Sequence, residues 1–249
     1  MATESQALLG SNHALDDVVG RLLHPTGEPK LDVKGAVRAG WAMFEQHPWA
    51  YMFWALIYII LQNVAVLAYF AESAKVLLAA PVLLLLSVPF QYAPFIVAAN
   101  TSRDNDWEFD IGSFLFTPVM YFFPIIVITL LVRLLTVVGL ALLVLPGIYA
   151  MATLSFAPMV FIEYHNHGIN VLDSMAVSYR TSRHVVWSIV VLAALSLLIL
   201  LAGSLWFGVG GLVALPVVQL AWADAFRQLF GYNPIFSGDP ASCLCCGCV

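Results

Sequence analysis

Charged side chains are scarce in this 249-residue chain. They make up only 10% of it, whereas 61% of the residues are hydrophobic and the mean hydropathy is +0.90. An ordinary soluble domain carries about 25% charge, so the composition excludes that class and predicts an integral membrane protein. The net charge of -5 and the scattered cations also exclude nucleic acid as a partner. Membrane lipids and other membrane proteins are the expected partners, and the oligomeric state is left open.

Cysteine is absent until the end of the chain. All four cysteines lie in the final segment CLCCGCV, at Cys243, Cys245, Cys246 and Cys248. A cytoplasmic tail is kept reduced, which disfavours disulfides. Thiols close to a bilayer are candidates for S-palmitoylation, and the last residues also have the form of a prenylation box. Lipidation is favoured over a metal site in the tail or no modification, and it indicates a eukaryotic endomembrane or plasma membrane.

A secretory signal is also missing. Residues 1–30 lack a basic first segment and a continuous apolar run. We therefore expect a partly disordered cytoplasmic tail over residues 1–30 and a membrane domain over residues 31–231. The cysteine-rich cytoplasmic tail is expected to occupy residues 232–249.

Long apolar runs are what the chain does contain. A bilayer crossing needs about 20 residues, and six runs approach or exceed this length, namely 49–70, 76–99, 118–144, 148–163, 185–203 and 206–229. The predicted fold is therefore all-α and polytopic, with six transmembrane helices arranged as three hairpins. Pro81, Pro89 and Pro94 predict a kinked second helix whose freed carbonyls are satisfied by neighbouring helices.

A Pro-Gly pair interrupts the apolar run over residues 114–162, which is about twice as long as one crossing needs. Proline stops a helix, and glycine allows the positive φ of a tight reversal. Pro146 and Gly147 are therefore predicted to form the turn between the third and fourth spans. The alternative is a kink within one very long helix.

Lysine and arginine are distributed unequally between the predicted loops. Eight of them fall on one side of the membrane, whereas Lys75 alone falls on the other. Cationic residues favour cytoplasmic loops. Both termini are therefore expected in the cytoplasm.

Short amphipathic stretches precede three of the predicted spans. Apolar residues recur at helical spacing over residues 33–44, after Asp32, and again over residues 171–179, after Asn170. Asp110 introduces a shorter stretch of the same kind. Because Asp and Asn favour the first position of a helix, an interfacial amphipathic helix is predicted before each hairpin. The alternative is chance amphipathicity beside unrelated spans.

Three stretches carry a family resemblance: AVRAGWAMFEQHPW before the first span, then LPGIYAMATLSFAPMVFIE and HNHGINVLDSMAVSYRTSRHVVW. They resemble the integral membrane domain that accompanies some glycerophosphodiester phosphodiesterases, and the related YciC-like and DUF975-like membrane proteins of unknown function. The resemblance covers about residues 33–231 and implies the fold alone. In that family the phosphodiesterase chemistry belongs to a separate soluble barrel, for which no stretch here is long enough, so neither enzymatic activity nor a cofactor is implied.

Arg133 lies midway through the third predicted span, where an arginine costs about 2.5 to 3.5 kcal/mol on insertion scales. At about 1.5 Å per residue, Gln62, Asn63 and Gln219 lie near its depth. Asp224 is the nearest formal opposite charge. These five residues form the predicted intramembrane polar cluster. It either surrounds a cavity for a lipid headgroup or solute, or locks the bundle, and the second interpretation is favoured.

Two further patterns concern metal binding and helix packing. In the segment EYHNH, Glu163, His165 and His167 are zinc-ligand types, but their spacing fits no helical ligand pair, so no metal site is predicted. Gly210 and Ala214 are spaced for close helix packing, which is expected within the chain before any dimerisation.

The residues that enzymes need for common reactions are not arranged in recognisable patterns. The sequence contains no nucleophile with a partnered base, no phosphate-binding loop and no paired intramembrane carboxylates. The predicted function is therefore non-catalytic, as a scaffold, an assembly subunit or a membrane organiser whose amphipathic helices lie on the membrane. The alternative is a transporter or lipid-handling protein with a polar cavity around Arg133.

Overall fold

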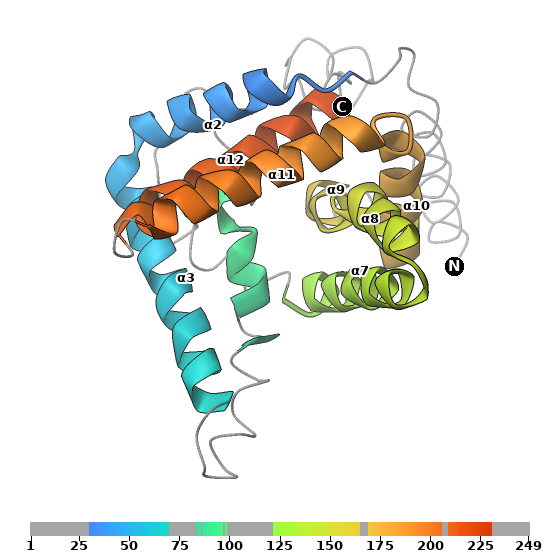
Figure 1. Cartoon of the computed structure of the whole chain (residues 1–249), viewed down its shortest axis with the longest axis horizontal. Helices are drawn as coiled ribbons and strands as arrows, with labels where there is room; N and C mark the ends of the chain where they lie inside the picture. Colours follow the sequence, from blue (N-terminus) through green and yellow to red (C-terminus); the bar gives the residue numbers. More distant parts are fainter. Residues whose placement is uncertain are drawn as a thin grey trace, which may run out of the picture.

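The computed structural model describes residues 30–69, 84–85, 87–96, 98, 122–164, 169–205 and 209–230. Within these ranges the chain is all-helical, without a strand. The cysteine tail, Lys75, Asp110, His165 and His167 lie outside the described residues. The helices with defined bounds (Figure 1) are α2 (Val33–Gln46), α3 (Pro48–Tyr69), α7 (Phe122–Leu142), α8 (Val144–Leu154), α9 (Ala157–Tyr164), α10 (Val171–Ser182), α11 (Val186–Ser204) and α12 (Val209–Phe230).

Three helical stretches in the described chain are long and apolar enough to cross a membrane. They are α7, the α8–α9 stretch (Val144–Tyr164) and α11. Only 17% of the apolar window is buried in α7 and in α11, against 61% in α8–α9. α7 and α11 therefore present apolar surface to their surroundings, and the stretches are compatible with an integral membrane protein.

The six predicted spans are not confirmed as a set. α3 is 22 residues long and largely apolar, and its apolar stretch is described as far as Val64. α12 carries its polar residues in its second half, where many of its side chains are buried against other helices. Because this half of α12 is buried within the protein, its side chains can be less hydrophobic than those of a helix that faces lipid. Most of the second predicted span lies outside the described residues.

The boundary between α7 and α8 lies at Leu143, which has extended backbone angles of φ -161° and ψ 146°. This corrects the predicted turn, because Pro146 and Gly147 both lie at the start of α8. Proline is tolerated there, since the first N–H groups of a helix have no intrahelical partner. Gly147 serves packing instead: a Cβ on it would lie 2.6 Å from the backbone nitrogen of Leu140, so α8 starts in close contact with α7.

Pro158 separates α8 from α9. A proline has no N–H for the carbonyl four residues earlier, and its ring clashes with that carbonyl, which here belongs to Leu154. The helix accordingly ends at Leu154 and resumes at Ala157. At this break the buried hydroxyl of Ser178, on α10, donates a hydrogen bond of 2.8 Å to the carbonyl of Thr153. α10 is thereby fastened to the interrupted helix.

The described part of the second predicted span is a helix that is interrupted at Tyr92. The N–H of Tyr92 donates a hydrogen bond of 3.1 Å to the carbonyl of Pro89, three residues earlier. Pro94 has no N–H to donate to the carbonyl of Phe90. The indole Nε1 of buried Trp54, on α3, donates to that carbonyl at 2.8 Å instead. The prediction of a kinked helix with a freed carbonyl satisfied by a neighbour is confirmed for this segment.

The first predicted amphipathic helix is confirmed as α2, and it lies lengthwise against α12 (Figure 1). Gly40 makes this contact possible, because a Cβ there would lie 2.7 Å from the backbone nitrogen of Ala221 and 2.8 Å from the carbonyl oxygen of Val217. At the start of α2, the N–H of Asp32 donates to Oε1 of Gln228 at 2.8 Å. The two helices are therefore antiparallel.

The second predicted amphipathic helix is confirmed as α10. Asn170 occupies the position before its first residue in an extended conformation, although its side chain makes no capping hydrogen bond. Asp173 lies in the first turn and Arg180 in the last. Each charge complements the helix dipole at its end, which favours a helix of this length.

α11 and α12 approach one another through small residues. A Cβ on Gly203 would lie 2.7 Å from that of Ala214 and 2.9 Å from the carbonyl oxygen of Gly210. Further along the pair, Nε1 of Trp222 donates to the hydroxyl of Ser196 at 3.1 Å. The predicted packing of Gly210 and Ala214 within the chain is thus confirmed.

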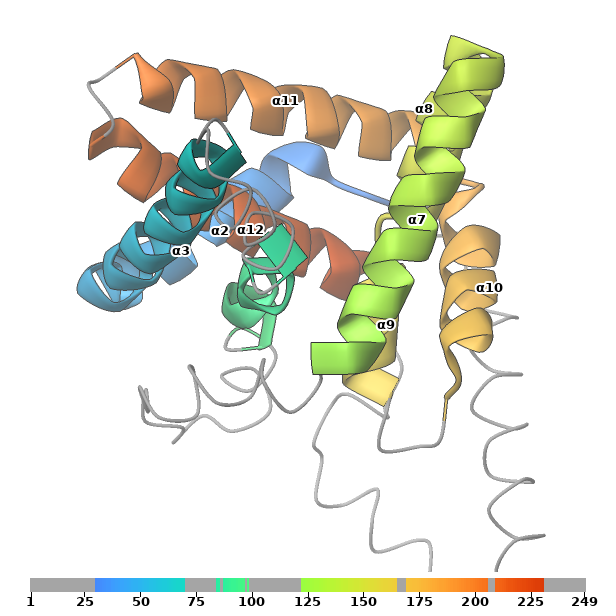
Figure 2. The ribbon, with the colours of Figure 1, turned by 90° about the horizontal axis from the view of Figure 1, so that it is seen from below.

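The helices fall into two groups that do not share one axis. α2 and α11 both pack on α12, whereas α7, α8, α9 and α10 contact one another. Figure 2 shows α7 crossing the direction of α11 steeply, and Figure 1 shows α3 running away from α2 and α12. The predicted arrangement as three hairpins is therefore not confirmed for the described helices.

Replacing Gly40 by alanine should destabilise the protein, because the added methyl group meets backbone atoms of α12 that cannot rotate away. Overpacking of this kind costs about 1 to 3 kcal/mol. Gly211→Ala is the matched control, since the nearest atom to its added methyl group is Cδ1 of Ile59 at 4.0 Å. Thermal unfolding in detergent should give a lower midpoint for Gly40→Ala than for Gly211→Ala. Equal midpoints would contradict the close contact.

Candidate functional site

Polar side chains connect α3 with the second predicted span. The amide Nε2 of Gln62, on α3, donates to the hydroxyl of Tyr58 at 3.2 Å and to the hydroxyl of Ser87 at 3.0 Å. Ser87 is buried, and its own hydroxyl donates to the carbonyl of Leu84 at 2.7 Å. Gln62 is therefore held by groups from two elements.

α7 adds two polar side chains at helical spacing to this arrangement. The hydroxyls of Thr129 and Tyr92 lie 3.5 Å apart, and both residues are buried. Arg133 is exposed, and its positive charge acts on the hydroxyls of Tyr58 and Tyr92. We call this set the polar layer; its members are Tyr58, Gln62, Ser87, Tyr92, Thr129 and Arg133.

The structure brings together part of the predicted polar cluster. Gln62 bonds the hydroxyl of Tyr58, and the charge of Arg133 acts on the same hydroxyl. Asn63 is exposed, and its amide donates to the carbonyl of Ile59, in its own helix, at 2.8 Å. Only Gln62 among the predicted partners from α3 therefore belongs to the polar layer with Arg133.

The two predicted partners on α12 lie elsewhere in the described structure. Gln219 is half-buried and makes no described hydrogen bond with Arg133. Oδ2 of Asp224 accepts a hydrogen bond of 2.8 Å from Gln228, whose side chain also bonds the backbone of Asp32. Asp224 thus supports the contact of α12 with α2.

Four members of the polar layer were not predicted from the sequence. The sequence does contain a signal for Tyr58 and Thr129. Tyr58 lies four residues before Gln62, and Thr129 lies four residues before Arg133, so each shares a helix face with a predicted residue. Ser87 carried no such signal, since the prolines around it obscure helical periodicity. Side-chain spacing alone also does not show which helix faces meet.

The chemistry available to the polar layer is binding rather than bond cleavage. It offers hydroxyls, one amide and one guanidinium, without a carboxylate or a nucleophile paired with a base. Among the described residues, no group of three or more His, Cys, Asp or Glu side chains is placed to hold a metal ion. The layer can accommodate a polar or anionic group.

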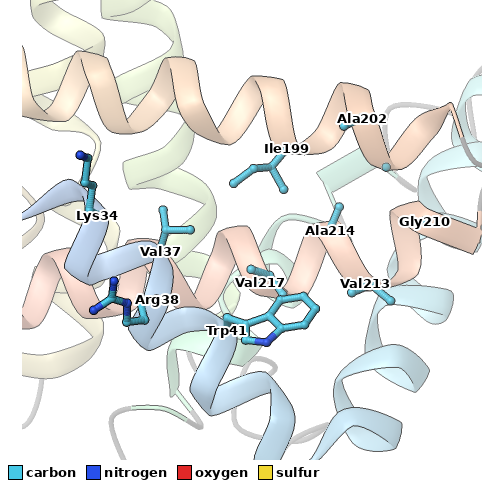
Figure 3. Close-up of a pocket in the computed structure, with 11 residues that line it drawn as sticks. Lys34, Val37, Arg38, Trp41, Ile199, Ala202, Gly210, Val213, Ala214 and Val217 are labelled. Atoms are coloured by element: carbon cyan, nitrogen blue, oxygen red, sulfur yellow. The ribbon is translucent and has the colours of Figure 1, made fainter.

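A second feature is an open groove of about 720 Å³ bordered by α2, α11 and α12 (Figure 3). α12 forms its floor with small and apolar residues, and α11 forms one wall. Its lining contains two cations, both from α2, and no carboxylate. We call it the α2–α12 groove; the residues that define it best are Lys34, Arg38, Trp41, Ile199, Val213 and Ala214.

The two cations of the groove lie on one face of α2. Lys34 and Arg38 are four residues apart and exposed, whereas Gly40 faces α12. None of the described residues forms an ion pair with either cation. Asp32 precedes the first residue of α2 and forms no described ion pair with them, and Glu45, near the end of the helix, accepts a hydrogen bond of 2.6 Å from Nε1 of Trp41. The lining of the groove therefore carries two positive charges and no carboxylate, with Asp32 just outside it at the start of α2.

No family model, no curated protein and no solved structure matches this chain. The resemblance to the membrane domain found beside some phosphodiesterases therefore stays a prediction.

Gln62→Leu should lower stability by about 0.5 to 1.5 kcal/mol, because it removes the donor shared by two hydroxyls. Asn63→Leu is the control: it is adjacent, and its side chain bonds only its own helix, so a change within about 0.5 kcal/mol is expected. Denaturant unfolding in micelles measures both. A larger loss for Asn63→Leu than for Gln62→Leu would argue against the polar layer.

Proposed function

We propose that this chain is a non-catalytic multi-pass membrane protein that acts as a scaffold, an assembly subunit or a membrane organiser. One observation carries the proposal: α7 and α11 leave most of their apolar side chains exposed or half-buried. Soluble monomers rarely expose apolar patches larger than a few hundred Å², whereas the hydrocarbon of a bilayer solvates such faces. The exposed side chains include Leu130, Leu134, Val137 and Val138 on α7, and Val191, Leu197 and Leu198 on α11.

Two exposed tryptophans support this placement in a bilayer. Trp49 is 81% exposed at the start of α3, and Trp187 is 78% exposed at the start of α11. Just before Trp187, Nε of Arg183 bonds His184 at 3.1 Å. Tryptophan and cations gather at membrane interfaces, so the proposal puts both helix ends near a membrane interface and keeps both termini on the cytoplasmic side.

The proposal also includes the family and the tail. It treats the chain as a relative of the phosphodiesterase-associated membrane domain, in which the membrane part itself has no catalytic role. Lipidation of Cys243, Cys245, Cys246 and Cys248 would hold the C-terminal tail against the membrane and would fit a eukaryotic endomembrane or plasma membrane. The membrane helices already provide anchoring, so lipidation would serve tail position or sorting.

Bromine-labelled phospholipids test the placement, because bromine quenches tryptophan fluorescence only on contact. In variants that retain a single tryptophan, Trp49 and Trp187 should be quenched strongly. Trp54 is 1% exposed and should be quenched little. The measurement is the fluorescence ratio between vesicles with and without brominated lipid. Weak quenching of all three residues would contradict a membrane location for these helices.

A transporter or lipid-handling function around Arg133 is the second candidate. It is favoured by an exposed cation on α7, four residues after Thr129, whose hydroxyl lies 3.5 Å from the buried hydroxyl of Tyr92. If it is correct, Arg133→Leu should abolish protein-dependent transfer of a fluorescent phospholipid between the leaflets of proteoliposomes, whereas Arg227→Leu, at the end of α12, should leave the rate unchanged. An equal rate for both variants and the unaltered protein would leave the scaffold function as the conclusion.

A further inference from the structure

We propose that the α2–α12 groove binds an anionic phospholipid drawn from the bilayer, with the phosphate at Lys34 and Arg38 and the acyl chains along α12. The proposal rests on the proposed function, since it requires the chain to lie in a membrane. It assigns a ligand to a site distinct from the polar layer around Arg133.

Charge complementarity selects an anionic headgroup. Lys34 and Arg38 contribute two positive charges to the groove, and no carboxylate lines it. The carboxylates of Glu45 and Asp224 are engaged by Trp41 and Gln228 through hydrogen bonds of 2.6 Å and 2.8 Å. A phosphate can accept hydrogen bonds from both an ammonium and a guanidinium group. The ligand should therefore carry its negative charge at this end of the groove.

The rest of the groove selects apolar chains. Figure 3 shows Ile199 pointing into it from α11, opposite Trp41 and above the floor formed by Val213 and Val217. Gly210 and Ala214 line the groove where α12 packs against Gly203 of α11. In the same view α2 and α11 diverge away from Lys34, so the groove widens from its charged end. This shape fits an amphiphile with one charged head and more than one apolar chain.

The groove extends away from its cations along α12. Its lining on α12 runs from Val217, beside Trp41, to Gly210 at the far end. This is about 10 Å of helix at about 1.5 Å per residue. The acyl chains of a phospholipid with its phosphate at Arg38 would lie along this stretch towards Gly210.

The direction of the two cations agrees with this orientation. Side chains on a helix tilt towards its N-terminus, so Lys34 and Arg38 lean towards the start of α2. That end also carries Asp32, Gln228 and Arg227, which make it polar. Long cationic side chains reach towards the membrane interface in this way. The headgroup would then lie at the polar end and the chains in the hydrocarbon.

Other ligand classes fit only half of the groove. A soluble anion would satisfy Lys34 and Arg38 but leave the apolar floor uncovered. An apolar helix from a second copy would cover the floor but leave both cations without a partner in an apolar setting, which is unfavourable. A membrane phospholipid satisfies both halves at once.

The first test compares spin-labelled phosphatidylserine and phosphatidylcholine in vesicles of phosphatidylcholine that contain the full-length protein. The immobilised fraction should be larger for phosphatidylserine. The double variant Lys34→Gln/Arg38→Gln should reduce this preference by about tenfold, given two cations near a membrane surface. The matched control Lys30→Gln/Arg227→Gln removes the same charge outside the groove and should keep the preference. Equal losses in both variants would overturn the assignment to the groove.

A second variant addresses the apolar half. Val213→Trp fills the floor while both cations remain, so it should lower the immobilised fraction of phosphatidylserine. Free inorganic phosphate should not displace the lipid from the unaltered protein. Full retention in Val213→Trp, or displacement by phosphate, would indicate that the cations bind an anion at the surface without using the groove.

Photo-crosslinking identifies the occupant directly. A photoreactive amino acid in place of Ala202, which is exposed and lines the groove, should form an adduct with the mass of a phospholipid. A crosslink to a second copy or to residues 1–29 of the same chain, in place of lipid, would overturn the proposal.

The outcomes separate this proposal from the proposed function. Protein that fails to float with the vesicles contradicts the membrane function itself. Protein that floats with them, shows quenching at Trp49 and Trp187, and immobilises both lipids equally keeps the membrane function and overturns the lipid site.

Discussion

Close backbone contact at glycine is the constraint on which this arrangement of helices depends. Lipid tails are as apolar as leucine, so helices in a membrane gain little from hydrophobicity alone and pack through small residues. Gly40 lets α2 reach the backbone of α12, Gly203 and Gly210 bring α11 against α12, and Gly147 brings α8 against α7. The first two contacts also decide where the α2–α12 groove lies, because they fix the distances between its walls and its floor.

Backbone carbonyls at the proline-containing segments add a second constraint. In an apolar environment each unsatisfied carbonyl costs several kcal/mol. Trp54 donates to the carbonyl of Phe90 that Pro94 leaves free, and Ser178 donates to the carbonyl of Thr153 beside the break before Pro158. Each donor belongs to a different helix from the acceptor. Proline therefore affects the fold in two ways. It interrupts its own helix, and it leaves a backbone carbonyl near the interruption to which a side chain of a neighbouring helix donates a hydrogen bond.

The polar layer and the α2–α12 groove differ in how their polar side chains are used. The amide of Gln62 donates to two hydroxyls, and the hydroxyl of Ser87 in turn donates to a backbone carbonyl, which suits a role in holding α3 in place. Lys34 and Arg38 have no such internal partners in the described chain. The groove is therefore better placed than the polar layer to recognise a molecule from outside. A scaffold or organiser that contacts specific lipids would combine both features.

The sequence by itself determined the helical class, the apolar faces, the amphipathic character of α2 and α10 and the kink at Pro94, because these depend on local periodicity and on proline chemistry. Only the tertiary structure decided that the break lies at Leu143, that Asp224 bonds Gln228, and that Gln62 bonds Tyr58 and Ser87. Depth counting could not predict these partners, because it gives position along an axis and not the rotation of each helix or its direction. The groove could not be predicted from the sequence either. Its sides come from α2, α11 and α12, and α2 is distant in sequence from the other two helices and meets α12 only where glycine permits backbone contact.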